Sequence, residues 1–73
     1  MRAKINLDTI SDVQNFVKIT TALNGKITVT DGKGLVVNAK SLMGLIYSLE
    51  FEELWCESEF DIWRQISEFI VEE

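Results

Sequence analysis

The side chains of this sequence that could take part in chemistry are hydroxyls, carboxylates and one thiol, because the 73 residues contain no histidine. The commonest general base of enzymes is therefore missing. Ser41 stands immediately before a short apolar segment, in the position of a helix N-cap, where an added phosphate would meet unpaired backbone amides. The residues themselves therefore predict that Ser41 caps a helix.

Cys56 is the only cysteine, so the sequence has no internal disulfide and no Cys/His cluster to hold zinc. We interpret Cys56 as a core residue, because no basic residue stands near it in sequence to lower the pKa of its thiol. Gly32-Lys33-Gly34 is too short for a phosphate-binding loop. We therefore expect a protein that is not an enzyme and that uses no metal and no cofactor.

Charge is distributed unevenly along the chain. Residues 50–73 carry nine acids and one base, a net −8, whereas residues 1–49 carry six bases and three acids, a net +3. The acidic part would repel a phosphate backbone, which argues against nucleic acid as a partner. The lone thiol and the absence of a signal peptide and of a long apolar run predict a cytoplasmic protein that does not associate with membranes.

Hydrophobic periodicity predicts seven elements in one domain, residues 1–73. Alternation typical of strands covers residues 2–7, 26–30, 35–39 and 52–57, and helical spacing covers residues 10–23, 42–47 and 59–71. Asp31-Gly32 predicts a hairpin turn between the second and third strands. The first helix is capped either by Ser11, with Gln14 completing a capping box, or by Thr9 two residues earlier. Ser58 is the expected cap of the last helix.

The order β-α-β-β-α-β-α predicts an α+β fold, in which a four-stranded, largely antiparallel sheet carries its helices on one face. The other face is open to water or to a partner. Trp55 is out of phase with Leu54 and Cys56 and is expected to project from that open face. The predicted core consists of Ile5, Val13, Phe16, Val17, Ile27, Val29, Val37, Leu45, Leu54, Ile66 and Phe69.

The run from Val37 to Gly44, VNAKSLMG, together with this order of elements, resembles the HPr family, the histidine phosphocarriers of the bacterial sugar phosphotransferase system. The resemblance implies an HPr-like open-faced β-sandwich. It implies that Ser41 matches the family's regulatory serine, so that Ser41 is either a site of regulatory phosphorylation or simply a helix cap. It also implies that Leu42, Met43 and Ile46 match exposed positions that bind partners. Tyr47 resembles a one-residue insertion, which would equally allow these three side chains to rotate inward.

The chain departs from the family where the carrier chemistry resides. The family's active-site loop is Gly-Leu-His-x-Arg-Pro, whereas the corresponding stretch here, Leu7 to Asp12, is shortened and lacks histidine, arginine and proline. Thr9 falls nearest the histidine position and Ser11 nearest the arginine position. Because a carrier needs an imidazole that accepts and surrenders a phosphoryl group, these degenerate active-site positions predict that phosphohistidine chemistry is lost.

Two hypotheses for function follow. The first is a non-catalytic, HPr-like regulatory module that binds an unidentified protein partner, with Ser41 as its candidate phosphorylation site and Leu42, Met43 and Ile46 as candidate contacts. The alternative is a structural domain that associates with itself through the open sheet face around Trp55. The first hypothesis predicts a monomer and the second predicts a homodimer.

Overall fold

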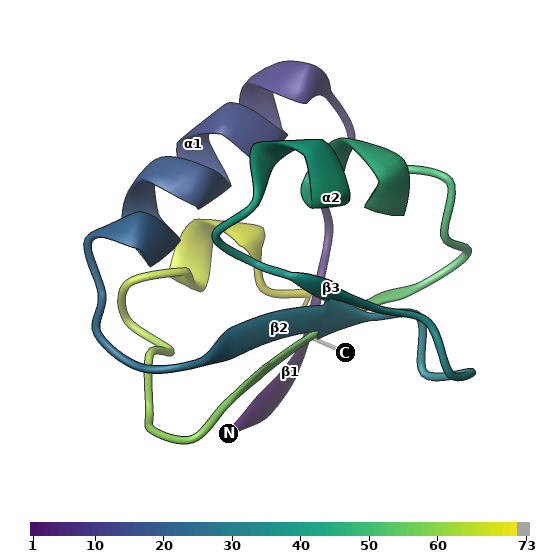
Figure 1. Ribbon diagram of the computed structural model, residues 1–73. Coiled ribbons are helices and arrows are strands. Elements are labelled where there is room, and N and C mark those ends of the chain that lie inside the picture. The colour runs from purple at the N-terminus through teal and green to yellow at the C-terminus, as the bar shows by residue number, and fades with distance from the viewer. Residues whose placement is uncertain (72–73) are drawn as a thin grey trace.

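The computed structural model describes residues 1–71 of the chain. Four strands, two α-helices and one 3₁₀-helix follow one another in the order β1 (Arg2–Ile5), α1 (Ile10–Thr21), β2 (Ile27–Thr30), β3 (Val36–Asn38), α2 (Leu42–Ser48), β4 (Leu54–Ser58) and η1 (Ser67–Phe69). The order predicted from the sequence is therefore confirmed as far as β4. Figure 1 shows α1 and α2 on the same side of the sheet.

The strands form one antiparallel sheet in the order β1-β4-β2-β3. β4 lies between β1 and β2, so these two strands run parallel to each other without touching. The hairpin between β2 and β3 contains Gly32 at a φ of +78°, a conformation that glycine adopts without a steric penalty. The α+β class and the four-stranded antiparallel sheet are confirmed.

The core lies between the sheet and the helices and follows the strand alternation. Cys56 is fully buried, as predicted, and so are Leu45 and Phe16. Nine of the eleven predicted core residues are buried, while Val17 and Val37 are partly buried and pack against the cluster. Burial of this apolar surface is the main source of stability, at roughly 25 cal/mol per Å² removed from water.

The cap of α1 is Thr9. Its hydroxyl accepts a hydrogen bond from the Asp12 amide at 3.1 Å, and the Asp12 carboxylate accepts one from the Thr9 amide at 3.2 Å. This reciprocal pair is a capping box built with an aspartate. Of the two caps that the sequence left open, Thr9 is confirmed, and Ser11 with Gln14 is wrong because α1 begins at Ile10 and Ser11 already lies in its first turn.

The predicted helix over residues 59–71 was also wrong. Ser58 ends β4 and its hydroxyl donates to the Phe60 carbonyl instead of capping a helix. The Asp61 carboxylate accepts from the Trp63 amide at 2.9 Å and so forms a turn, and helical structure is limited to η1. The apolar residues at positions 62, 66 and 69 are nevertheless buried.

The edge strand β1 explains why the last helix does not form. Ile70 makes an antiparallel bridge with Ile5, the Asn6 amide donates to the Phe69 carbonyl at 2.8 Å, and the Val71 amide donates to the Lys4 carbonyl at 2.9 Å. The Phe69 carbonyl and the Val71 amide are therefore bound to Asn6 and to β1 instead of to a helix. A short isolated helix has little intrinsic stability, so this tertiary pairing prevails.

Candidate functional site

Ser41 occupies the N-cap of α2, as the sequence predicted. Its hydroxyl oxygen accepts a hydrogen bond from the Gly44 amide at 3.2 Å, and its own amide donates to the Asn38 carbonyl at 3.0 Å. A Cβ atom at Gly44 would stand 3.4 Å from both the Ser41 hydroxyl and the Val37 side chain, so this corner is closely packed. The Ser41 side chain remains partly exposed.

The outer side of α2 is apolar. Leu42, Met43 and Ile46 are 42%, 83% and 39% exposed, whereas Leu45 on the opposite side is fully buried. The interpretation in which an insertion at Tyr47 turns these three side chains inward was therefore wrong. Tyr47 is itself exposed, and we refer to Leu42, Met43, Ile46 and Tyr47 as the α2 surface.

Tyr47 was not predicted as part of a site. Its ring meets the ring of Phe51 edge-on, with the centroids 5.6 Å apart. The spacing of four residues was a usable signal, because such positions adjoin on a helix and its C-terminal extension. The contact steadies the end of α2 and leaves one side of Tyr47 on the surface.

The open face of the sheet carries two rows of side chains that cross all four strands. Register places Arg2, Glu57, Thr28 and Asn38 in one row, and Lys4, Trp55, Thr30 and Val36 in the next. The two basic side chains lie at the β1 edge and the neutral ones toward β3. The guanidinium of Arg2 donates to the Glu57 carboxylate at 2.9 Å, which neutralises the charge of this row.

Trp55 lies on this open face but is only partly exposed. The guanidinium carbon of Arg2 stands 4.3 Å from the centroid of its ring, a cation–π contact. A Cβ atom at Gly32 would lie 3.5 Å from the indole, so the hairpin turn also approaches the ring. The indole nitrogen donates to the Glu53 carboxylate at 3.1 Å. The chain's own residues thus cover much of the ring.

Thr9 and Ser11, which the resemblance to HPr implies are degenerate active-site positions, lie at the N-terminal end of α1. The Thr9 hydroxyl is engaged by the Asp12 amide, and the nearby carboxylate of Asp12 also accepts from the Asp8 amide. Two carboxylates beside Thr9 would repel a phosphate rather than attract one. Ser11 is exposed in the first turn of α1.

Ser41 and Thr9 lie toward opposite ends of α1. The Thr20 hydroxyl donates to the Ala39 carbonyl at 2.8 Å, and the ammonium of Lys40 donates to the Leu23 carbonyl, so the chain just before Ser41 is fixed to the C-terminal end of α1. Thr9 caps the other end, and twelve helical residues rise about 18 Å. The two hydroxyls therefore do not form one site.

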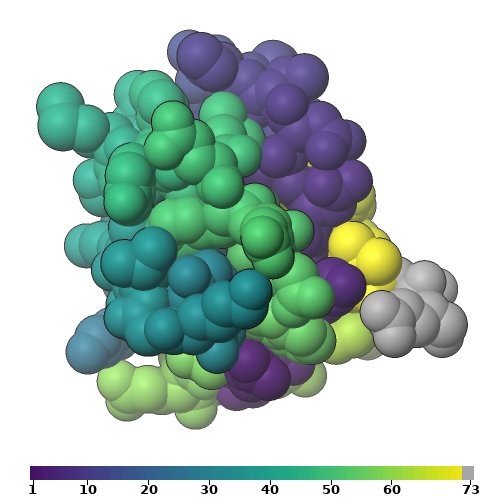
Figure 2. All heavy atoms as spheres, turned by 90° about the vertical axis from the view of Figure 1, so that its right-hand side faces the viewer, coloured from purple at the N-terminus to yellow at the C-terminus, as the bar shows by residue number. Residues whose placement is uncertain are grey.

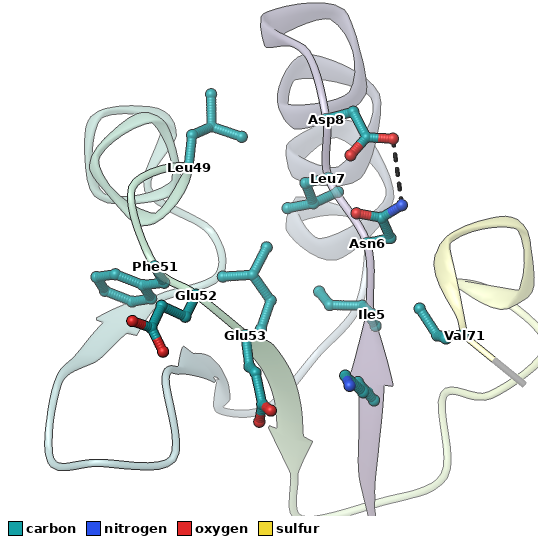
Figure 3. Close-up of a pocket in the computed structure, with 11 residues that line it drawn as sticks. Ile5, Asn6, Leu7, Asp8, Leu49, Phe51, Glu52, Glu53 and Val71 are labelled. Atoms are coloured by element: carbon teal, nitrogen blue, oxygen red, sulfur yellow. Dashed lines mark hydrogen bonds between the residues drawn. The ribbon is translucent and has the colours of Figure 1, made fainter. Parts of the chain in front are cut away.

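A hollow of about 270 Å³ lies between β1 and the segment that joins α2 to β4 (Figure 3). Leu7 and Leu49 contribute apolar walls, Glu52 and Glu53 contribute carboxylates, and Lys4 contributes one base. No local pattern predicts this hollow, because the pairing of β1 with β4 brings residues 4–8 and 49–54 together. Figure 2 shows the hairpin tip against the neighbouring segment around residue 50, where Lys33 binds Glu52 at 3.1 Å.

The thiol of Cys56 has low reactivity. Burial raises the pKa of the Cys56 thiol to about 11, so the nucleophilic thiolate is scarce near neutral pH. In residues 1–71, His, Cys, Asp and Glu side chains nowhere gather in a group of three that could hold a metal ion. Across the same stretch, the helices are too short and too polar to span a bilayer.

Comparison with known proteins adds no relative. No protein-family model, no curated protein and no solved structure matches this chain.

Proposed function

We propose that this chain is a non-catalytic, HPr-like regulatory module that binds a protein partner through the α2 surface, with phosphorylation of Ser41 controlling the affinity. The observation that carries the proposal is the exposure of Leu42, Met43 and Ile46 directly after a cap serine whose side chain is partly exposed. An unbranched, polarizable Met at the centre of such a surface suits adaptable contacts.

The relation to HPr rests on two features. The order β-α-β-β-α-β through Ser58 agrees with six of the seven elements from which the resemblance was inferred, and the seventh, a helix over residues 59–71, is absent. The run from Val37 to Gly44 comprises the end of β3, the cap and the first turn of α2. It is therefore one continuous corner of the molecule that includes both Ser41 and the start of the α2 surface.

The effect of phosphorylation follows from charge. A phosphate on Ser41 would add about −1.5 to −2 charges beside Leu42 and Met43. The first turn of α2 carries no acid that would repel it. The chain already has a net charge of −5, so the modified corner would bind an acidic partner surface less well and a basic one better.

Self-association through the open face around Trp55 has less support. Arg2 and the hairpin turn cover part of the indole, which leaves less apolar area than an exposed tryptophan would offer. Size-exclusion chromatography with light scattering separates the two proposals. A monomer favours the α2 surface, and a dimer that Trp55→Ser abolishes favours the open face.

The binding experiment compares three immobilised variants in extract from the native cell. The paired variant Leu42→Ser, Met43→Ser removes the α2 surface. The paired variant Ile10→Ser, Trp63→Ser removes similarly exposed apolar side chains elsewhere. We expect a partner that the wild type and the second pair retain and the first pair loses, with Ser41→Asp changing its amount. Equal recovery on all variants would contradict the proposal.

A further inference from the structure

The two edges of the sheet differ in the backbone hydrogen bonds that their edge strands make. At the β1 edge, the Val71 amide donates to the Lys4 carbonyl and the Phe69 carbonyl accepts from the Asn6 amide. At the other edge, β3 pairs with β2 alone among the strands of residues 1–71. Proteins usually protect such an edge by keeping it very short, or with a proline, a bulge or a charged residue, because it offers unpaired backbone groups. β3 is short, with three residues, but its sequence Val-Val-Asn has neither a proline nor a charge.

The direction of each backbone group of β3 follows from its hydrogen bonds. The Ala39 amide donates to the Ile27 carbonyl at 3.0 Å, and the Asp31 amide donates to the Leu35 carbonyl at 3.2 Å. Residues 35, 37 and 39 therefore face β2. In an antiparallel pair the intervening residues point the other way. The amide and carbonyl of Val36 and the amide of Asn38 thus face outward, while the Asn38 carbonyl accepts from Ser41.

The side chains around this edge are apolar and basic. Val36 is 60% exposed. A hollow of about 330 Å³ adjoins it on the sheet, and its two charged lining residues are Lys26 and Lys40. One donor of the Lys40 ammonium is bound to the Leu23 carbonyl, and an ammonium has three donors. Glu57 and Glu59 line a separate hollow together with Lys26, so the Lys40 end is the more favourable for a carboxylate.

We propose that the β3 edge binds an extended segment of a partner protein as a fifth strand, and that this segment alternates apolar side chains with carboxylates. Outward backbone groups of Val36 and Asn38 select an extended chain. Val36 and the hollow beside it select an apolar side chain, and Lys26 and Lys40 select an acid. Lys40 directly precedes Ser41, and the Asn38 carbonyl accepts from the Ser41 amide, so this surface adjoins the α2 surface. None of the four residues of the α2 surface contributes to it, and the inference therefore does not require the proposed function.

The first test uses acetyl-Val-Glu-Val-Glu-Val-amide as the probe and acetyl-Val-Lys-Val-Lys-Val-amide as a control of the same length and opposite charge. Each is titrated into the ¹⁵N-labelled chain. We expect saturable shifts and slower hydrogen exchange at the amides of Val36 and Asn38, with the acidic probe binding about tenfold more tightly. The Val37 amide already faces β2 and should gain no protection. Equal binding of both probes, or shifts confined to the α2 surface, would overturn the proposal.

The second test separates backbone pairing from charge. Val36→Pro removes an outward amide without removing a bond to β2, and prolines are tolerated on edge strands. Affinity for the acidic probe should fall about tenfold. An acidic probe with N-methylated valine amides should lose affinity similarly against the unaltered chain, which covers the case in which Val36→Pro does not fold. Full affinity of the methylated probe would exclude strand addition.

The third test concerns charge and the identity of the occupant. Lys26→Glu should weaken the acidic probe severalfold, whereas Lys18→Glu, the same change on the exposed face of α1, should not. Equal effects of these two substitutions would show that the lysines are not part of the site. A concentration-dependent dimer that Val36→Pro abolishes would show that the occupant is a second copy of this chain, and would overturn the assignment to a partner segment.

Discussion

The ring of Phe69 meets the ring of Phe16 edge-on, with the centroids 5.3 Å apart and the planes at 84°. This contact packs η1 against α1, and Phe16 is fully buried. Phe16→Ala should lower the free energy of unfolding by about 3–5 kcal/mol, as measured by urea or thermal unfolding. Ile10→Ala, at an exposed position of the same helix, is the control and should cost far less. An unchanged melting temperature for Phe16→Ala would contradict this placement.

The caps of α1 can be distinguished by substitution. Thr9→Ala removes the acceptor of the Asp12 amide and should cost about 0.5–2 kcal/mol. Ser11→Ala changes an exposed side chain inside the first turn and should stay within about 0.5 kcal/mol of the wild type. Unfolding curves measured side by side would show the opposite ranking if Ser11 were the cap.

At α2, Ser41→Ala should cost about 0.5–2 kcal/mol, because the Gly44 amide loses its acceptor. Ser41→Asp retains an acceptor at the N-cap and should be nearly neutral for stability. Thermal unfolding of the three proteins provides the comparison. If Ser41→Asp were as unstable as Ser41→Ala, an aspartate would not reproduce the cap. It could then not mimic the phosphate without also lowering stability.

Phosphoryl transfer should be absent. The chain has no histidine, and the Thr9 hydroxyl is bound to the Asp12 amide among carboxylates. Incubation with the first enzyme of the phosphotransferase system and labelled phosphoenolpyruvate should leave the chain unlabelled, with HPr as the positive control. Stoichiometric, acid-labile labelling would disprove our interpretation of the segment from Leu7 to Asp12.

Stability should depend on pH through Cys56. Burial raises the pKa of its thiol from 9.0 to about 11, so the folded chain keeps the proton where the unfolded chain releases it. The contribution is complete below pH 9 and is lost as the pH rises from 9 to 11. The free energy of unfolding, measured across this window, should decline more steeply for the wild type than for Cys56→Ala. Parallel curves would show that the thiol is not desolvated.

Local patterns predicted the four strands and both α-helices, because each of these elements is specified largely by residues that neighbour one another in the sequence. Asp31-Gly32 between two alternating runs was sufficient for the β2–β3 hairpin, and Ser41 before an apolar segment was sufficient for the α2 cap. The helical spacing of Ile62, Ile66 and Ile70 misled the prediction of the last element. Ile70 pairs with Ile5, and no local pattern reveals a partner 65 positions away.

The same limit applies to the candidate sites. The alternation of side chains placed Trp55 on the open face. Arg2 covers its ring only because the register of β1 with β4 brings together two residues that are 53 positions apart in the sequence. The rotation of α2 was undecided from the sequence, because the apparent insertion at Tyr47 could turn either side inward. Burial of Leu45 and Ser48, three positions apart, fixes the rotation. The relation to HPr stays a prediction.

The position of β1 at the sheet edge has a consequence during translation. Its first residue in register, Arg2, pairs with Glu57, 55 positions later. At about 5–20 residues per second, a ribosome takes roughly 3–10 s to synthesise the intervening chain. Throughout that delay Ala3 and Ile5 have no strand to pair with, and closing so long a loop is slow. The apolar side chains of β1 therefore stay without their partner strand until the residues of β4 have been synthesised.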